Sequence, residues 1–288
     1  MFATEIFVLF SPPLLKKAFH QNYFIMKTVI IPVDFSETSL NAARFAAQML
    51  SGSKDTRIVL YSMFEDEEDS ETTGTYLESL KAELELKGNK EIECVKELAD
   101  DLIDSIERLV FQKAATLVVM GITGKSPIKQ LLVGSNTLKL VEKNICPVMI
   151  IPPDAAFNGV NNILFTSDFQ EVKESTPVLY IKTVLDFFKA NLHIVNVSNE
   201  HYVSLTEQFQ SEREKLLSLL KEYNPEFYFI GMNDFHEAIE QFVKDKNIDL
   251  IITIPRFHSG ITSIFKLSAT KKLVFHSSVP VLAAHEKM

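Results

Sequence analysis

This 288-residue sequence contains an internal repeat, which limits the folds that it can adopt. Asp34 aligns with Asp168, 134 positions further on, and the copies stay in nearly constant register to their ends, where the offset is 133. Matches in chain order at nearly constant spacing indicate two copies of one structural unit. Three pairs of segments carry the repeat: TVIIPVDF (28–35) with NILFTSDF (162–169), RIVLYSM (57–63) with NLHIVNV (191–197), and CPV (146–148) with VPV (279–281).

The repeat divides the chain into two domains with a junction near Pro152-Pro153-Asp154. We expect a first domain over residues 26–153 and a second over 154–288, since a domain usually takes about 100–200 residues. Residues 1–25 are expected to form a disordered or non-native extension. Positive charge follows their apolar run instead of preceding it, which is not the order of a secretory signal.

Within each copy, apolar runs alternate with stretches of helical spacing, a pattern typical of βαβ units and a parallel sheet. We therefore predict a three-layer α/β fold in which ligands bind at the carboxyl ends of the strands. Ser36 is the expected N-cap of the first helix, with Ser39 as the alternative. The expected strands are 28–34, 57–63, 92–95, 116–120, 147–151, 162–168, 192–197, 226–232, 249–254 and 279–284. The expected helices are 36–51, 76–87, 99–114, 136–143, 178–189, 206–223, 237–246 and 268–276.

Charge and composition exclude several classes of protein. The 38 acidic against 29 basic residues give a net charge of −9, which disfavours general binding to nucleic acid. No run of about 18 apolar residues predicts a membrane span. Two cysteines cannot form a disulfide framework, so we expect a cytoplasmic protein with free thiols at Cys94 and Cys146. The acidic run 65–71 is expected to be a mobile solvated loop, with a cation site as the alternative.

A glycine-rich segment, MGITGKSPIKQLLVGSNT at residues 120–137, follows the fourth strand of the first copy. Glycines allow a ligand to approach the backbone, and the amides at a helix N-terminus favour a phosphate. The alternative is that these glycines only make a turn and a helix entry. A P-loop is excluded because Val119 stands where its first glycine belongs, and Thr123 and Pro127 break the dinucleotide-binding pattern.

The spacing Gly121-x2-Gly124-x9-Gly134-Ser135 resembles the ATP-binding signature of universal stress proteins. IPVDFSETSLNAARFA and NICPVMIIP resemble the first strand and helix and the last strand of that family. From about residue 27 the chain resembles a tandem member with two such domains. The resemblance implies a five-stranded parallel sheet of order 3-2-1-4-5 in each domain, of the adenine-nucleotide alpha-hydrolase-like class.

The resemblance also implies a site for ATP, with or without Mg²⁺, in the first domain. Asp34 would hydrogen-bond the ribose or adenine, and the backbone at Ser62 would read the adenine. The family commonly has an apolar residue where Asn136 stands. The site residues carried over are Pro32, Val33, Asp34, Ser62, Met120, Gly121, Thr123, Gly124, Gly134, Ser135, Asn136 and Thr137.

The second copy departs from this signature. Ile254, Phe257 and Leu267 replace the three glycines, and only Ser268 keeps its residue type. Large side chains block a close approach to the backbone and disfavour positive φ. We therefore expect one nucleotide site per chain, with the second copy as a structural or regulatory partner.

Catalytic and metal-binding patterns are weak. No G-x-S-x-G elbow or H-E-x-x-H spacing occurs, and neither cysteine has the surroundings of an activated thiol. We expect no catalytic residues, no metal site, and at most a slow ATPase assisted by Lys125 and Ser126. A metal site at His258 and His276 is the minor alternative.

Three functions remain open at this stage. The first is an ATP-binding regulatory protein of the stress response with an unidentified protein partner. The second is an ATP-using enzyme of the related α/β group. The third is a module that binds another small ligand or a protein through the second copy. The fifth strands, 148–151 and 281–284, are expected to pair within the chain, and a homodimer is possible in addition.

Overall fold

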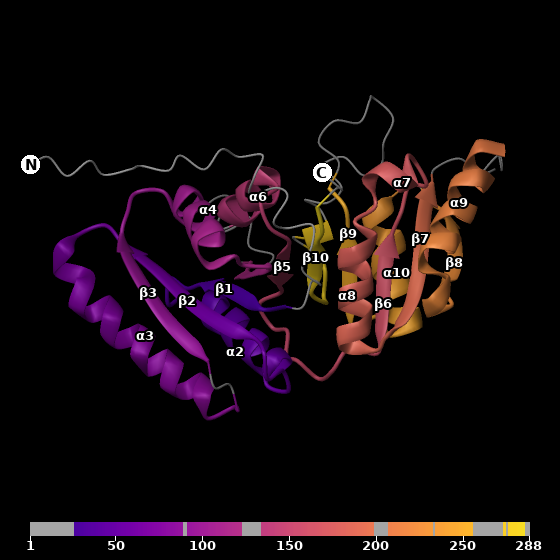
Figure 1. The fold of residues 1–288 in the computed structure, drawn as a ribbon. Coiled ribbons are helices and arrows are strands. Elements are labelled where there is room, and N and C mark those ends of the chain that lie inside the picture. Colours follow the sequence, from indigo (N-terminus) through magenta and orange to yellow (C-terminus); the bar gives the residue numbers. More distant parts are fainter. Residues whose placement is uncertain are drawn as a thin grey trace, which may run out of the picture.

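The computed structural model describes residues 26–88, 91–122, 134–198, 207–232, 234–255, 273–274 and 276–285. It forms one ten-stranded sheet flanked by helices on both faces (Figure 1). The strand order is β3-β2-β1-β4-β5-β10-β9-β6-β7-β8. Each half therefore has the order 3-2-1-4-5, which confirms the predicted α/β class and strand order.

The two halves join through their fifth strands, β5 (Val148–Ile151) and β10 (Val281–Ala283). These strands run antiparallel, with Leu282 opposite Met149, whereas all other neighbouring strands are parallel. The expected intramolecular pairing is thus present in the structure. It leaves β3 and β8 as the two edges of the sheet.

The first half follows the predicted succession of strands and helices. Its α2 helix begins after Ser36, whose hydroxyl accepts a hydrogen bond from the Ser39 N–H at 3.3 Å, so Ser36 is the N-cap. The elements are β1 (Thr28–Pro32), α2 (Glu37–Leu50), β2 (Arg57–Phe64), α3 (Ser70–Glu85), β3 (Ile92–Leu98), α4 (Leu102–Lys113), β4 (Leu117–Gly121) and α6 (Gly134–Lys143), followed by β5.

The second half repeats this order with one change. The helix after its first strand is split into two pieces at Thr176-Pro177, because proline lacks an N–H and disfavours a helical residue before it. The elements are β6 (Asn162–Thr166), α7 (Val172–Ser175), α8 (Val178–Phe188), β7 (Asn191–Ser198), α9 (Glu207–Leu220), β8 (Glu226–Gly231), α10 (Phe235–Lys246) and β9 (Leu250–Thr253), followed by β10.

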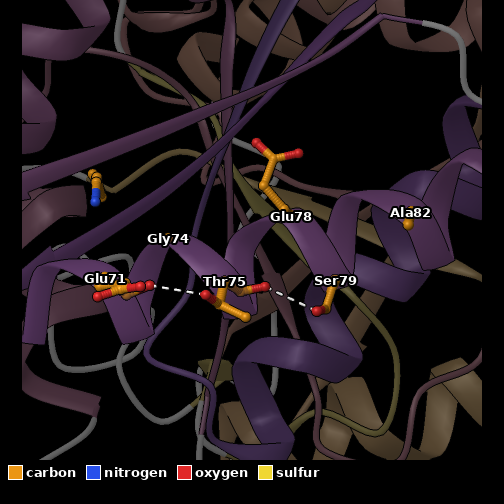
Figure 2. Close-up of a pocket in the computed structure, with 7 residues that line it drawn as sticks. Glu71, Gly74, Thr75, Glu78, Ser79 and Ala82 are labelled. Carbon is orange, nitrogen blue, oxygen red and sulfur yellow. Dashed lines mark hydrogen bonds between the residues drawn. The ribbon is translucent and has the colours of Figure 1, made fainter.

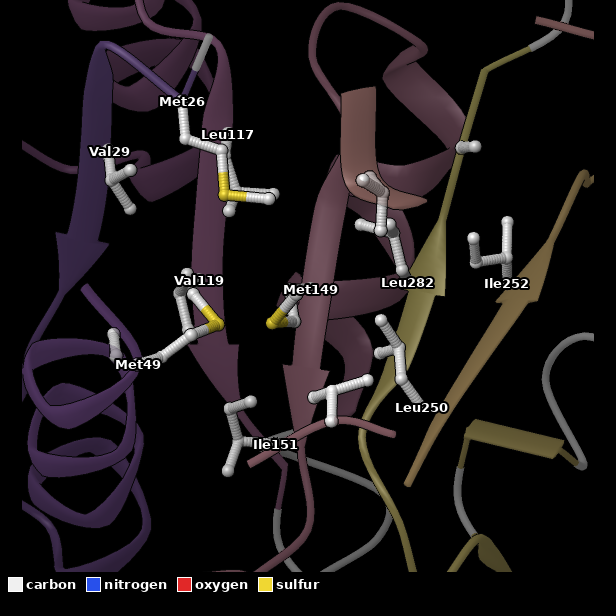
Figure 3. Close-up of a cluster of buried hydrophobic side chains, with 14 of the residues drawn as sticks. Met26, Val29, Met49, Leu117, Val119, Met149, Ile151, Leu250, Ile252 and Leu282 are labelled. Carbon is white, nitrogen blue, oxygen red and sulfur yellow. The ribbon is translucent and has the colours of Figure 1, made fainter. Parts of the chain in front are cut away.

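The sheet separates two hydrophobic cores, and each runs through both halves. One lies under α2, α3, α8 and α9, and the other lies under α4, α6 and α10. In the first core, Met149 of β5 and Leu282 of β10 are 1 % and 0 % exposed at the junction between the halves (Figure 3). These junction residues are therefore as fully buried as those in the interior of either half.

Two expectations are wrong in detail. The acidic run 65–71 is not simply a loop, because Glu67–Asp69 forms a 3₁₀ turn and Ser70 begins α3. That helix starts six residues before the predicted start at Tyr76. Acidic side chains favour the first turn of a helix, where they face the positive end of its dipole. The four-residue helix α7 was not expected at all.

Both cysteines lie in the described part of the chain. Cys146 is buried and Cys94 is half-buried on β3, and both are free thiols. Over the residues that the structure describes, no helix is long and apolar enough to cross a membrane.

Candidate functional site

The carboxyl ends of β1, β2 and β4 meet at one edge of the sheet in the first half. Pro32 of β1 lies opposite Tyr61 of β2, and the Val33 N–H donates to the Tyr61 carbonyl at 2.8 Å. On its other side β1 pairs with β4, which ends at Gly121. The topology thus brings together Asp34, Ser62 and Gly121, which are far apart in the sequence.

The turn after β1 holds the Asp34 carboxylate in a fixed position. Asp34 Oδ1 accepts hydrogen bonds from the Ser36 N–H at 3.0 Å and from the Ser36 hydroxyl at 2.5 Å. Phe35 between them has a φ of 59°, in the left-handed region that a phenylalanine rarely adopts. The side chain of Asp34 nevertheless remains exposed, so a ligand can reach it.

Electrostatics keep this carboxylate ionised. Partial burial works to raise the pKa of Asp34, but the hydrogen bonds from Ser36 and Ser39 together outweigh it and leave the pKa below its ordinary value. An ionised carboxylate accepts hydrogen bonds only, which suits the hydroxyls of a ribose or the amino group of a base.

A cluster of hydroxyls around Asp34 was not among the predicted site residues. Ser36 Oγ lies 3.1 Å from Thr38 Oγ1 and 3.3 Å from Ser39 Oγ, and the Asp34 N–H donates to Ser39 Oγ at 3.3 Å. The signal in the sequence was the run DFSETS, which places three short hydroxyl side chains in the first turn of a helix directly after an aspartate.

Gly121 allows α2 to pack closely on the end of β4, a contact that was not predicted from the sequence. A Cβ atom added to it would lie 2.3 Å from the Thr38 carbonyl oxygen and 2.7 Å from its carbon, so only glycine fits. The first turn of α2 therefore packs directly on the end of β4. A larger residue at position 121 would disturb the protein itself, whatever ligand binds nearby.

The helix α6 is tied to the same edge. It begins at Gly134, and the buried Thr137 hydroxyl donates to the Gly121 carbonyl at 3.5 Å. Its first N–H groups have no partner one turn earlier in the helix, as at any helix N-terminus. Thr123 and Gly124 lie outside the described residues, as does the side chain of Ser135.

The other predicted site residues lie where the strands end. Pro32, Val33 and Ser62 are buried, so any contact with a ligand would come from their backbone or from a small exposed part of the side chain. Met120 is 7 % exposed and packs in the core on the α4 side. Asn136 is half-buried in the first turn of α6.

The corresponding edge of the second half has the same backbone but different side chains. The Ser167 N–H donates to the Val195 carbonyl at 3.0 Å, as Val33 does to Tyr61, and Phe169 has a φ of 51°. Asn196 stands at the position of Ser62, and its amide donates to the Ser167 carbonyl at 2.9 Å. Ile254 stands in place of Gly121 and is 7 % exposed in the core.

An aromatic cluster covers the turn after β6. The Phe169 ring lies 5.0 Å from Phe209, 6.1 Å from Phe227 and 5.8 Å from Phe229, measured between ring centroids. Among the described residues of the first half, one aromatic pair lies at this place, Phe35 with Tyr76 at 5.3 Å. The turn after the first strand is thus surrounded by more aromatic side chains in the second half than in the first.

A shallow groove runs along α3 at the outer side of the first half (Figure 2). The hydroxyls of Thr75 and Ser79 already donate to the carbonyls one turn earlier, at 3.0 and 2.8 Å. Lys96 of β3 also lines the groove and donates to the Ser70 carbonyl at 2.7 Å. These polar groups are engaged within the protein, so we assign the groove no ligand.

The first half of the chain is similar to known proteins. The model of the universal stress protein family matches residues 26–152. A universal stress protein of Methanocaldococcus jannaschii is 24 % identical over 144 residues, which span 44 % of this chain and 82 % of that protein. An uncharacterized protein of Schizosaccharomyces pombe is 31 % identical over 143 residues, 43 % of this chain and 23 % of its own length.

Among solved structures, a universal stress protein from Archaeoglobus fulgidus matches with a TM-score of 0.70 at 19 % identity. The match covers 91 % of this chain and 99 % of that one, so it includes both halves. At this identity the likeness establishes the fold.

Proposed function

Since residues 26–152 match the model of the universal stress protein family, we propose that the first half binds ATP and that the protein acts as a nucleotide-dependent regulator in the response to stress. The observation that carries the proposal is the edge where β1, β2 and β4 end. There Gly121 packs on the first turn of α2, which follows the exposed, ionised Asp34, and its carbonyl accepts a hydrogen bond from Thr137 in the first turn of α6.

Each part of the nucleotide has a candidate partner at this edge. Asp34 would accept hydrogen bonds from the ribose hydroxyls, and the backbone at Ser62 would read the adenine. The N–H groups at the start of α6 would hold the phosphates, because they carry the positive end of the helix dipole. Thr123, Gly124 and Ser135 are proposed to complete the phosphate site, with Mg²⁺ as an optional companion of the phosphates.

The proposal assigns one nucleotide to each chain. Ile254 fills the position of Gly121 in the second half, and the aromatic cluster around Phe169 surrounds the turn that corresponds to Asp34. Both changes add apolar bulk where the first half is polar or open. The second half would then serve as the structural or regulatory partner of the first.

The helix α2 offers a route by which occupancy could be communicated. Its first turn packs on Gly121 at the proposed site, and Asn41 one turn later donates to the carbonyls of Pro152 at 3.3 Å and Ala155 at 3.1 Å. Phe45 packs edge to face on Phe157 at 5.5 Å. A shift of α2 on binding would therefore reach the segment that joins the halves.

Calorimetric titration of the full chain with ATP tests the proposal. Asp34→Ala and the matched variant Asp168→Ala should both fold, since each carboxylate lies in a turn outside the core. We expect about one ATP per chain, affinity reduced about tenfold or more in Asp34→Ala, and wild-type affinity in Asp168→Ala.

Two results would overturn the proposal. One is the absence of ATP binding by folded wild-type protein, which would favour the module that binds another ligand. The other is loss of binding in Asp168→Ala with Asp34→Ala unaffected, which would move the site to the second half. Steady release of a product other than ADP with a cosubstrate would instead favour an enzyme of the related α/β group.

A further inference from the structure

The helices α4 and α10 are equivalent in the two halves and begin and end in the same way. Asp101 caps α4 by accepting from the Ile103 and Asp104 N–H groups, and Asp234 caps α10 by accepting from the His236 and Glu237 N–H groups. A residue with a left-handed backbone ends each helix. Positions in α10 can therefore be compared with those in α4 at an offset of 133 residues.

In the first half a lysine at the end of α6 forms ion pairs with α4. Lys143, the last residue of α6, lies 3.2 Å from Asp104 and 3.0 Å from Glu107. These two carboxylates raise the pKa of Lys143, with Glu107 contributing more than Asp104. The bridge is permanently charged at neutral pH.

In the second half the two acidic positions remain and the lysine is replaced. Glu237 and Glu240 stand where α4 has Asp104 and Glu107, but His276 stands at the position of Lys143. His236 stands at the position of Ile103, a residue of the hydrophobic core in the first half. The His236 and His276 rings face each other with centroids 5.0 Å apart and planes inclined by 34°.

This separation fits two imidazoles that share one metal ion. A zinc–nitrogen bond of about 2.0–2.1 Å places each ring centroid about 3.2 Å from the ion. Two such rings at a tetrahedral angle would then have centroids about 5 Å apart. The observed distance agrees with that value.

A carboxylate is available on the same face of α10. Glu240 follows His236 by four residues, a spacing that places both on one side of a helix. Its Oε1 atom is buried and has no hydrogen-bond partner within the described part of the chain. Two imidazoles and a carboxylate are a common ligand set for Zn²⁺.

We propose that His236 and His276, with Glu240 as the third protein ligand, bind a divalent transition-metal ion such as Zn²⁺. The ion would fasten the C-terminal helical segment to α10, as Lys143 fastens α6 to α4. Among the described residues no three such side chains already converge as a metal site, so binding requires Glu240 to change rotamer toward the rings. The proposal is independent of the nucleotide site.

The test uses full-length protein stripped with a chelator and titrated with ZnCl₂ in a calorimeter. Absorption of the Co²⁺-substituted protein reports the coordination geometry. The first half supplies the variants, His276→Lys and His236→Ile, which install the residues found at Lys143 and Ile103. His193→Val is the matched control, because Val59 occupies that position in the first half. Circular dichroism of the metal-free variants checks that each is folded.

We expect one Zn²⁺ per chain with an intense tetrahedral Co²⁺ band, and affinity lowered about tenfold or more in each of the two variants but unchanged in His193→Val. Zinc should raise the melting temperature of the wild type and of the control only. Absence of stoichiometric binding would overturn the proposal and leave the rings as a stacked pair. Binding that survives in both folded variants would overturn it as well.

Discussion

The two halves share their strand order and several backbone features but differ in most of their side chains. The shared features belong to the fold, and the differences indicate where function could differ. Phe35 and Phe169 both have positive φ after the first strand, and Asp101 and Asp234 both cap the equivalent helix. A left-handed residue in that turn therefore belongs to the fold and not to a ligand. The halves differ at the end of the fourth strand, where the first half has Gly121, the exposed Asp34 and the hydroxyls around it, and the second half has Ile254 and the aromatic cluster around Phe169.

The helix after the first strand shows how one residue sets this difference. In the first half α2 runs unbroken and its Thr38 carbonyl rests on Gly121. In the second half the helix is split at Thr176-Pro177, and Ile254 and Val172 both belong to the buried core. Position 121 therefore contacts the helix backbone in the first half, whereas the equivalent position of the second half carries a buried side chain.

The largest effect is expected from replacing that glycine. Gly121→Val should destabilise the protein by about 3 kcal/mol, because its side chain would collide with the Thr38 backbone. Gly231→Ala is the control, since nothing lies within 4 Å of the added atom, and it should change stability by no more than about 0.5 kcal/mol. Urea unfolding measures both. Equal stability of the two variants would remove the packing role of Gly121.

Acidification should loosen the junction between the halves. His285 follows β10 beside β5, is 9 % exposed, and has a pKa lowered to about 4 by burial, which outweighs the hydrogen bonds to Asn144 and Cys146. Its charged form is favoured in the unfolded chain, so stability is complete above about pH 6.5 and falls as the pH approaches 4. The loss is at most about 3 kcal/mol.

Unfolding measured from pH 8 to 4 checks this expectation. His285→Gln removes the titrating group, so its stability should fall less than that of the wild type over the window from pH 6.5 to 4. Parallel curves for the two proteins would contradict the role given to His285. Pro152 occupies the equivalent position in the first half, which has no such titration there.

A smaller effect is expected at the position of Ser62. Asn196→Ser installs the first-half residue and removes the buried hydrogen bond to the Ser167 carbonyl, which should cost about 1–2 kcal/mol. Gln241→Ala is the control, because it removes an exposed hydrogen bond to Asp245 and should cost no more than about 0.5 kcal/mol. Thermal unfolding compares them. If Asn196→Ser matched the control, its amide would not stabilise the turn.

The smallest effect is expected at the surface of the first half. Arg44 binds Glu83 through two hydrogen bonds, at 2.7 and 3.0 Å, with both side chains nearly two-fifths exposed. Arg44→Lys loses this bidentate geometry and should lower the free energy of unfolding by about 0.5 kcal/mol. Arg57→Lys, whose Nε lies 4.0 Å from Glu91, should show no measurable loss in the same experiment. A larger loss at Arg57 than at Arg44 would reverse this ranking.

The succession of strands and helices along the chain was predictable, because hydrophobic periodicity and the repeat both depend on burial, which the sequence records directly. The order of the strands within the sheet came from the resemblance to universal stress proteins. The helix predicted from residue 178 begins there as α8, but the short helix α7 before Thr176-Pro177 was not predicted. The left-handed Phe35 was not, since phenylalanine seldom adopts positive φ and is held there by surrounding contacts. The early start of α3 at Ser70 was hidden by acidic residues that look like a solvated loop.

The candidate site was predictable in its location but not in its detailed contacts. Asp34, Ser62 and Gly121 come together because parallel strands end at one edge, as the pattern implied. That Gly121 accommodates Thr38, and that Thr137 donates to the Gly121 carbonyl, depends on contacts between helices and strands distant in sequence. No local pattern encodes such contacts.

Hydrogen exchange measured by mass spectrometry with and without ATP shows which half binds the nucleotide, since it reports both halves in one experiment. The account predicts slower exchange in peptides covering residues 33–41 and 134–140, and unchanged exchange in 167–176. Protection of 167–176, with the first-half peptides unchanged, would contradict the claim that the nucleotide site lies in the first half alone.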